Sequence, residues 1–185
     1  MLIIGITGTL GAGKGTIVDY LIKTKGFKHY SVRAFLIREI EKRGLTVDRD
    51  SMVIVANDLR AKHSPAYIAE QLFEEAKTSG ENCVIESIRT PGEVEALKRK
   101  GNFYLFAVDA APELRYSRIQ SRQSETDHIS FETFLENEQR EMQSTDPNKQ
   151  NIGKCITMAD FVFENNGDIN ELNTKVEKIL HGIRQ

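Results

Sequence analysis

Glycines gather near the start of the chain, in the stretch GITGTLGAGKGT at residues 5–16. Apolar residues flank it, with Leu2–Ile4 before it and Ile17–Val18 after it. A short buried strand that runs through glycines into a helix is the setting in which G-x-x-x-x-G-K forms a phosphate-binding loop. Glycines let the backbone turn sharply, so that successive N–H groups and the helix N-terminus point at an anion. The stretch therefore predicts a strand, a phosphate-binding loop and a helix, in that order.

The loop residues have separate expected roles. Lys14 adds positive charge for the β- and γ-phosphates of a nucleoside triphosphate, and a hydroxyl that binds Mg²⁺ should follow it. Here position 15 is glycine, and the hydroxyl comes one residue later, at Thr16. We also expect the glycines to leave free the space that the phosphates need. The residues predicted to bind nucleotide in this loop are Gly8, Gly11, Ala12, Gly13, Lys14, Gly15 and Thr16.

Short apolar segments alternate with helical patterns along the chain. The expected strands are 2–6, 29–32, 83–85, 103–108 and 161–163. The expected helices are 14–24, 34–43, 64–78, 91–100, 112–122, 130–142 and 168 to the C-terminus. Ser64 is predicted to cap the third helix, with Pro65 at its first position. This alternation predicts a doubly wound α/β fold, a parallel sheet with helices on both faces, in one domain over residues 1–185.

Two segments are too long for a minimal alternating fold. Between Val32 and Cys83 there are too many helical residues for one crossover, and residues 122–160 are polar and charged. Both segments fit inserts that sit over a site on the sheet. Both equally fit long solvated helices, and the sequence leaves the two interpretations open.

Composition excludes several classes of protein. The chain is 39% hydrophobic and 28% charged with a net charge of −2, which argues against a dedicated nucleic-acid-binding protein. No apolar run approaches membrane-spanning length, and the N-terminus lacks a signal-peptide pattern, so we expect a cytoplasmic protein without nucleic-acid or membrane partners. Cys83 and Cys155 fit no metal-ligand spacing and are expected to be reduced thiols.

The loop reads G-x-x-G-x-G-K-G-T, which resembles the phosphate loop of adenylate kinase and related nucleoside monophosphate kinases. VIESIRTPGEVEAL, residues 84–97, resembles the segment after the third strand of these kinases. APELRYSRIQSR, residues 111–122, resembles the helix that leads into their lid. The resemblance implies a P-loop kinase fold: a three-layer sandwich around a five-stranded parallel sheet, with a helical acceptor-binding insert at about 33–80 and a short lid at about 123–150.

The resemblance also implies roles for two residues after the third strand. Glu86 would hold Mg²⁺ together with Thr16, directly or through water. Arg89 would face the phosphate of the acceptor. The chain departs from the family here, since the family usually has Asp at the position of Glu86 and a Gly-Phe-Pro stretch where this chain has Ser87–Ile88.

Several arginines are candidates for the transferring phosphoryl group. Arg118 and Arg122 lie four residues apart and share a helix face, so the resemblance gives both a catalytic role beside Lys14 and Arg89. Arg115, one turn earlier, is predicted to be a solvated charge. Arg140 could close over the site from the far side of the lid.

ADFVFENNGDINEL, residues 159–172, resembles the last strand and base-side loop of dephospho-CoA kinase and of an archaea-rich kinase-like family. The resemblance implies that Asn165 lines the nucleotide base, although a plain turn would use Asn166-Gly167 equally well. In the acceptor segment at least one arginine should bind the acceptor phosphate. The candidates there are Arg33, Arg38, Arg49 and Arg60, with Arg38 and Arg49 expected to be surface charges.

Together the motifs imply an ATP- and Mg²⁺-dependent kinase that acts on small-molecule nucleotide substrates. The expected reaction transfers the γ-phosphoryl group to a nucleoside or deoxynucleoside monophosphate, by positioning and charge neutralisation. Dephospho-CoA kinase is the nearest alternative. An alternative of another class is a nucleotide-binding switch without kinase activity.

Overall fold

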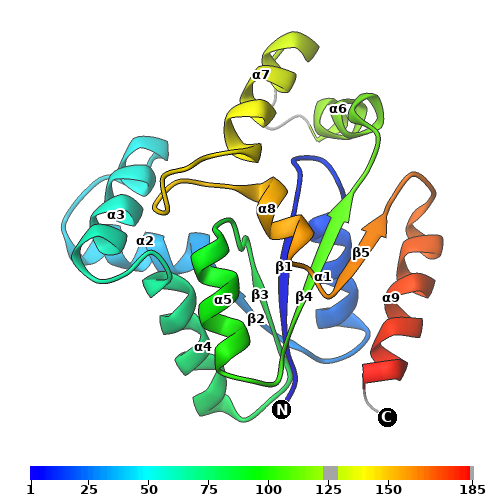
Figure 1. Ribbon diagram of the computed structural model, residues 1–185, viewed down its shortest axis with the longest axis horizontal. Coiled ribbons are helices and arrows are strands. Elements are labelled where there is room, and N and C mark those ends of the chain that lie inside the picture. Colours follow the sequence, from blue (N-terminus) through cyan, green and yellow to red (C-terminus); the bar gives the residue numbers. More distant parts are fainter. Residues whose placement is uncertain (123–128, 184–185) are drawn as a thin grey trace.

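Across the residues that the computed structural model describes, 1–122 and 129–183, five strands form one parallel sheet in the order β2-β3-β1-β4-β5 (Figure 1). The side chain of Arg49 is also outside the described part. The strands are β1 (Ile3–Gly8), β2 (Lys28–Ser31), β3 (Cys83–Glu86), β4 (Phe103–Asp109) and β5 (Phe161–Glu164). Each lies where the sequence predicts it, so the expected fold is confirmed.

The centre of the sheet is apolar on both faces. Every residue of β1 is buried, and β1 pairs with β3 on one side and β4 on the other. Near-continuous apolar runs of this kind are typical of parallel strands that helices cover from both sides. Because all strands are parallel, their carboxyl ends meet at one edge, which is the upper edge in Figure 1.

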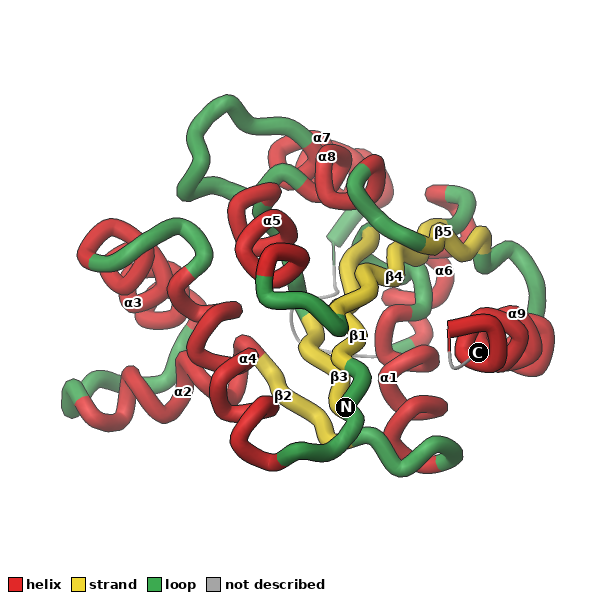
Figure 2. The backbone as a smooth tube through the Cα atoms, turned by 60° about the horizontal axis from the view of Figure 1, so that its bottom comes forward, coloured by secondary structure: helices red, strands yellow, loops and turns green. Residues whose placement is uncertain are grey.

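Two layers of helices cover the sheet (Figure 2). The helices α1 (Lys14–Lys23) and α9 (Ile169–Ile183) pack their apolar residues against one face. The opposite face is covered by α4 (Tyr67–Ser79), α5 (Pro91–Arg99) and α8 (Ile152–Thr157). No helix in the described part of the chain has the length and apolar character that crossing a membrane requires.

Three helices, rather than one crossover, connect β2 to β3. They are α2 (Val32–Lys42), α3 (Arg49–Lys62) and α4. The prediction that Ser64 caps the third predicted helix is wrong: α4 begins at Tyr67, because the Ser64 carbonyl accepts a hydrogen bond from the Tyr67 N–H in a preceding turn. The helix α3 was not predicted and is capped by Asp48, which accepts from the Ser51 N–H.

The polar segment after α6 (Pro112–Ser121) contains α7 (Phe131–Met142) and then α8. The helix α7 matches its predicted range, including its cap Ser130. The predicted lid, residues 123–150, is therefore described only from residue 129, and residues 123–128 lie outside the described part. Figure 1 places α6 and α7 above the carboxyl ends of the strands.

Candidate active site

The phosphate loop follows β1 and ends at Gly13, which occupies the cap position of α1. Gly8, Gly11 and Gly13 have φ angles of 139°, 78° and 108°. These angles lie in the left-handed region that other residues rarely adopt. The predicted order of strand, glycine loop and helix is therefore confirmed.

The glycines are needed mainly because other parts of the protein approach the loop closely. A Cβ atom would lie 2.0 Å from the Val108 carbonyl oxygen at Gly8, and 2.5 Å from the Arg115 carbonyl oxygen at Gly11. At Gly13 it would lie 2.3 Å from the Asn165 amide nitrogen. Close neighbours therefore exclude a side chain at these three glycines, and the expectation that the glycines also leave space for phosphates stays a prediction. A Cβ at Gly15 would have no described neighbour within 4 Å.

Side chains from two other strands fix the loop. The Thr9 hydroxyl donates to Asp109 at the end of β4, at 2.5 Å. The amide of Asn165, which follows β5, donates to the Ala12 carbonyl oxygen at 2.7 Å, and Asn165 itself is buried. The geometry thus gives Asn165 a structural contact with the loop. Its predicted contact with a nucleotide base stays a prediction.

Lys14 lies partly buried at the start of α1, with its ammonium group folded against the loop. It donates to the carbonyl oxygens of Gly8 and Thr9 at 2.8 and 2.7 Å. Desolvation by burial, and after it the positive charge of Arg89, lower the pKa of Lys14 to about 8. Arg122 acts in the same direction, so positive charges converge on the loop.

We expect nucleotide binding near pH 8 to take up protons. With a pKa of about 8, Lys14 is partly neutral at that pH, and a polyphosphate beside it would raise the pKa and return the proton. The expected uptake is about 0.5 proton per ADP bound. Titration calorimetry in buffers of different ionisation enthalpy measures it. Lys14→Met at saturating ADP should show no uptake, and an equal uptake in this variant would contradict the assignment.

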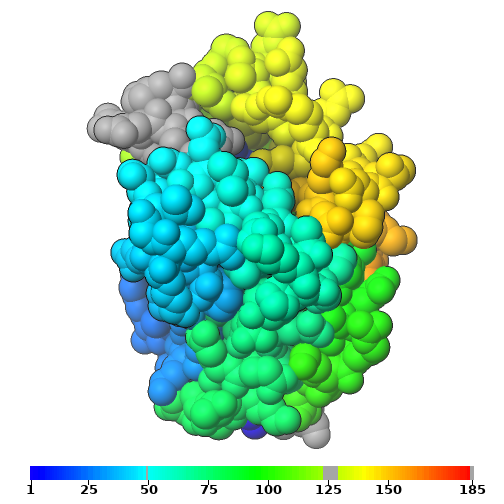
Figure 3. Space-filling view, turned by 90° about the vertical axis from the view of Figure 1, so that its left-hand side faces the viewer, coloured from blue at the N-terminus to red at the C-terminus, as the bar shows by residue number. Residues whose placement is uncertain are grey.

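A cavity of about 530 Å³ opens at the carboxyl ends of β2 and β3. The strand β3 pairs with β1, which leads into the loop. Its walls come from α2, α3, the end of α7 and residues 148–150. Figure 3 shows the surfaces of α2–α3 and of the residues after α7 on one side of the molecule. The charged lining residues are Arg33, Arg60, Arg89, Arg140, Lys149, Glu86 and Glu141. The apolar ones are Val32, Leu36, Met52, Val53 and Ala56.

Arg60 is the most enclosed basic group of the cavity for which a contact is described. Its side chain is 11% exposed, and its guanidinium lies 3.6 Å from Glu93 on α5. Its Nε has no hydrogen-bond partner in the described part of the chain. The other oxygen of Glu93 accepts from the backbone N–H groups of Arg89 and Thr90. A buried donor without a partner costs free energy, and the Arg60 side chain also lines the cavity, so we take Arg60 as a candidate for binding an anionic group there.

Glu86 and Arg89 lie where the sequence places them, at the end of β3 and just after it. The Glu86 carboxylate lines the cavity, 3.4 Å from the His29 ring on β2. Ser87 follows with a φ of 67°, a left-handed conformation that turns the chain at the cavity wall. Arg89 donates to the Gln150 side chain at 2.9 Å and lies 3.7 Å from Glu141 on α7.

The arginines at positions 115, 118 and 122 have different surroundings. Arg118 donates to the backbone oxygens of Asn165 and Gly167 at 3.0 and 3.4 Å, so it reaches the turn between β5 and α9. Arg122 is exposed at the end of α6. The prediction that Arg115 is a solvated charge is wrong: it is 2% exposed, because the loop and α7 pack over it.

The structure also separates the arginines of the acceptor segment. Arg33 and Arg60 line the cavity. Arg38 pairs with Glu75 on the surface at 2.9 Å, as expected of a surface charge. The prediction for the side chain of Arg49 lies outside the described residues. Arg140 lines the cavity from α7, opposite α2 and α3.

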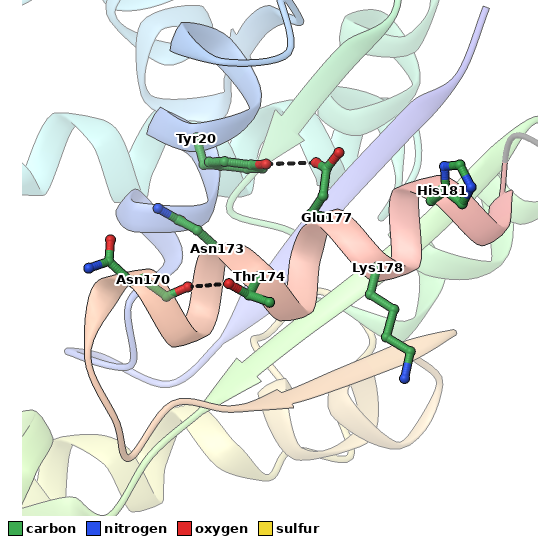
Figure 4. A pocket seen from close by; sticks show the side chains of 7 residues that line it. All are labelled: Tyr20, Asn170, Asn173, Thr174, Glu177, Lys178 and His181. Atoms are coloured by element: carbon green, nitrogen blue, oxygen red, sulfur yellow. Dashed lines mark hydrogen bonds between the residues drawn. The ribbon is translucent and has the colours of Figure 1, made fainter.

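A second hollow lies between α1 and α9 and shares none of its described lining residues with the loop (Figure 4). Tyr20 donates to Glu177 across it at 2.6 Å. Lys178 points away from this pair. The loop and the cavity beside β3 form the better candidate site, because Arg89 in the cavity wall acts electrostatically on Lys14 in the loop.

Sequence analysis missed the cavity residues that follow the middle of α7. Glu141, Lys149 and Gln150 complete the wall opposite Arg89. Their only sequence signal was the long polar segment that they belong to. Which residues of such a segment line a cavity depends on how the segment folds back over the sheet. The pattern of apolar residues in the sequence does not predict this.

Comparison with known proteins agrees with this arrangement. Residues 4–144 match a family model described as an AAA domain. A UPF0200 protein of Methanococcus vannielii is 30% identical over 191 residues, which cover 99% of each chain. The chain belongs to the UPF0200 family. Another member, from Methanothermobacter thermautotrophicus, is also 30% identical, over the whole of this chain and 92% of its own.

Solved structures share the whole fold. TT1252 from Thermus thermophilus has a TM-score of 0.62 at 22% identity, over 98% of this chain and 97% of its own. A dephospho-CoA kinase from Campylobacter jejuni has a TM-score of 0.60 at 15% identity, over 98% and 96%. A shikimate kinase from Bacteroides thetaiotaomicron has a TM-score of 0.56 at 15% identity, over 97% and 98%. At these identities the likeness shows the fold, which is that of P-loop kinases.

Proposed function

We propose that the protein transfers the γ-phosphoryl group of ATP to a small anionic acceptor, with a nucleoside or deoxynucleoside monophosphate as the preferred class. The observation that carries this proposal is the arginine-lined cavity at the end of β3, the strand that pairs with β1 and so lies next to the strand leading into the phosphate loop. Arg89 links the cavity to the loop, because it lines the cavity and its charge lowers the pKa of Lys14 in the loop. Donor and acceptor phosphates would therefore meet between Lys14 and Arg89.

The lining of the cavity supports an acceptor with a charged end and a flat apolar body. Basic side chains outnumber acidic ones by five to two among the described lining residues. Arginines bind phosphate through two parallel hydrogen bonds, which gives both affinity and orientation. The apolar wall from α2 and α3 would receive a nucleobase. The volume lies within the ordinary range for small-molecule sites.

The loop would bind the phosphates of ATP, and Mg²⁺ would bind with them. Gly15 has open space at the start of α1, and Lys14 supplies a cation beside the loop. No group of three or more His, Cys, Asp or Glu among the described residues could hold a metal ion by itself. We propose that Thr16 and Glu86 would hold Mg²⁺ together with phosphate oxygens, and that it would neutralise charge on the phosphates.

The other proposed roles concern charge and exclusion of water. Arg122, whose charge reaches Lys14, would stabilise the transferring phosphoryl group. Arg118 would act at the nucleotide side, since its described contacts lie in the turn after β5. We propose that α7 and residues 143–150 belong to a lid, which would limit hydrolysis of ATP.

The decisive experiment incubates the protein with ATP, Mg²⁺ and a panel of acceptors, and follows ADP formation. The panel contains the nucleoside and deoxynucleoside monophosphates, dephospho-CoA and a sample without acceptor. We expect ADP formation that depends on one class of monophosphate. If dephospho-CoA alone stimulated ADP formation, the acceptor would be dephospho-CoA rather than a monophosphate. A slow rate that no acceptor changes would favour a nucleotide-dependent switch.

Arg60→Met should raise the KM for the acceptor about 10- to 100-fold and leave the KM for ATP unchanged. The estimate follows from the loss of one charged hydrogen bond, about 1.5–3 kcal/mol. Arg38→Met is the matched control, since Arg38 lies on the surface beside Glu75. Steady-state kinetics measure both constants, and a thermal melt checks that the variants fold. An unchanged KM for the acceptor in folded Arg60→Met would place the acceptor elsewhere.

A further inference from the structure

Arg115 is a buried cation whose donors reach three separate segments. Its Nε donates to the Ala110 carbonyl oxygen at 2.7 Å, in the turn between β4 and α6. One terminal nitrogen donates to the Leu10 carbonyl oxygen, inside the phosphate loop, at 3.3 Å. Both terminal nitrogens donate to the carboxylate of Glu138 on α7, one of them at 2.9 Å. One guanidinium thus joins the loop to α7.

The helix α7 carries side chains that contact Arg115 and side chains that line the cavity. Phe134, one turn before Glu138, is 1% exposed, and its ring lies 5.4 Å from the Arg115 guanidinium. One turn after Glu138, Glu141 lies 3.7 Å from Arg89 and lines the cavity with Arg140. A displacement of α7 would therefore disturb the Arg115 pair and the cavity wall together.

We propose that Arg115 is a positioning residue that couples the phosphate loop to α7 through Glu138. A nucleotide that orders the loop around the Leu10 carbonyl would thereby hold α7, and with it the wall formed by Arg140 and Glu141. The inference rests on the proposed function only in requiring that the loop bind a nucleotide.

Packing alone does not account well for this arrangement. A buried ion pair is a weak source of stability, because desolvation offsets much of the attraction, and apolar residues of similar size often stabilise a protein as well. The pair instead provides a defined orientation of α7 relative to α6. The two parallel hydrogen bonds between Arg115 and Glu138 set the orientation of α7 relative to Arg115, a specificity that non-directional apolar contacts lack.

Hydrogen exchange with and without ADP tests the coupling. In the wild type we expect ADP to slow exchange in both the loop, residues 8–16, and α7. In Glu138→Gln the loop should still be protected by ADP, with an affinity within about threefold of wild type, while α7 loses its protection. Arg115→Lys, which keeps the charge and loses the paired geometry, should behave in the same way. Glu136→Gln is the control, because it makes the same change at an exposed position of α7.

The outcomes separate this inference from the proposed function. Equal protection of α7 in Glu138→Gln and in the wild type would overturn the coupling. So would a wild type that binds ADP and shows protection in the loop alone. A wild type that does not bind ADP in calorimetry would overturn the proposed function, and the coupling with it. A purely structural pair would lower the melting temperature of Glu138→Gln and leave the ADP-induced protection of α7 intact.

Discussion

Lys14→Ala should lower phosphoryl transfer by at least about 10²–10³-fold, the loss seen when one preorganised charge-stabilising group is removed from an active site. Lys14 is held against the loop by the Gly8 and Thr9 carbonyl oxygens, and its charge would meet the donor phosphates there. Coupled-assay turnover and ADP calorimetry measure the effect. Lys23→Ala, at the exposed end of the same helix, should be neutral.

The fold should survive the loss of Lys14. Burial lowers its pKa, which means that the folded protein holds the charged form at a cost to stability below pH 8. Removing the ammonium relieves that cost and leaves two carbonyl oxygens without their donor, so the two effects oppose each other. Near-normal turnover in a folded Lys14→Ala variant would exclude the loop as the catalytic phosphate site.

Arg89→Ala should reduce kcat/KM for the acceptor by about 10²–10³-fold. Arg89 is the arginine that both lines the cavity and acts electrostatically on Lys14, so its loss should affect binding and transfer together. The pKa of Lys14 should also rise, because Arg89 lowers it, and proton uptake at pH 8 should shrink accordingly. Arg99→Ala, at the exposed end of α5, is the control.

Two results would contradict this role. If kcat/KM fell in Arg89→Ala while proton uptake stayed the same, Arg89 would act on the acceptor alone. If both stayed the same, the contacts of Arg89 with Gln150 and Glu141 would be purely structural.

Much of the fold could be predicted because its determinants are local. Short segments of three to six residues, most of them apolar, predicted the five strands, and caps such as Thr90 and Ser130 marked helix starts. The phosphate loop was predictable for the same reason, since its left-handed turns require glycine at fixed positions. The helix α8 escaped because it is six residues long and buries only Ile152 and Cys155, too few for a periodic signal.

The parts of the site that sequence reasoning missed depend on contacts between distant segments. Arg115 shares the inner face of α6 with Ile119, four residues later, but a charged residue on a predicted helix favours a solvated interpretation. Its partner Glu138 comes 23 residues later, on another helix. The close approaches to Gly8 and Gly13 are likewise made by residues of β4 and of the turn after β5. Such pairings are set by topology.

The contacts that complete the phosphate loop can form only late in synthesis of the chain. The strand β1 emerges first, yet Thr9 meets its partner Asp109 after 100 residues, and Ala12 meets Asn165 after 153. At about 5–20 residues per second, synthesis of the second interval takes about 8–30 s. The neighbouring strands β3 and β4 emerge only within that interval, and the loop lacks its contact with Asn165 until the end of it. Nucleotide can therefore stabilise only the nearly completed chain, and the growing one must be shielded by other means.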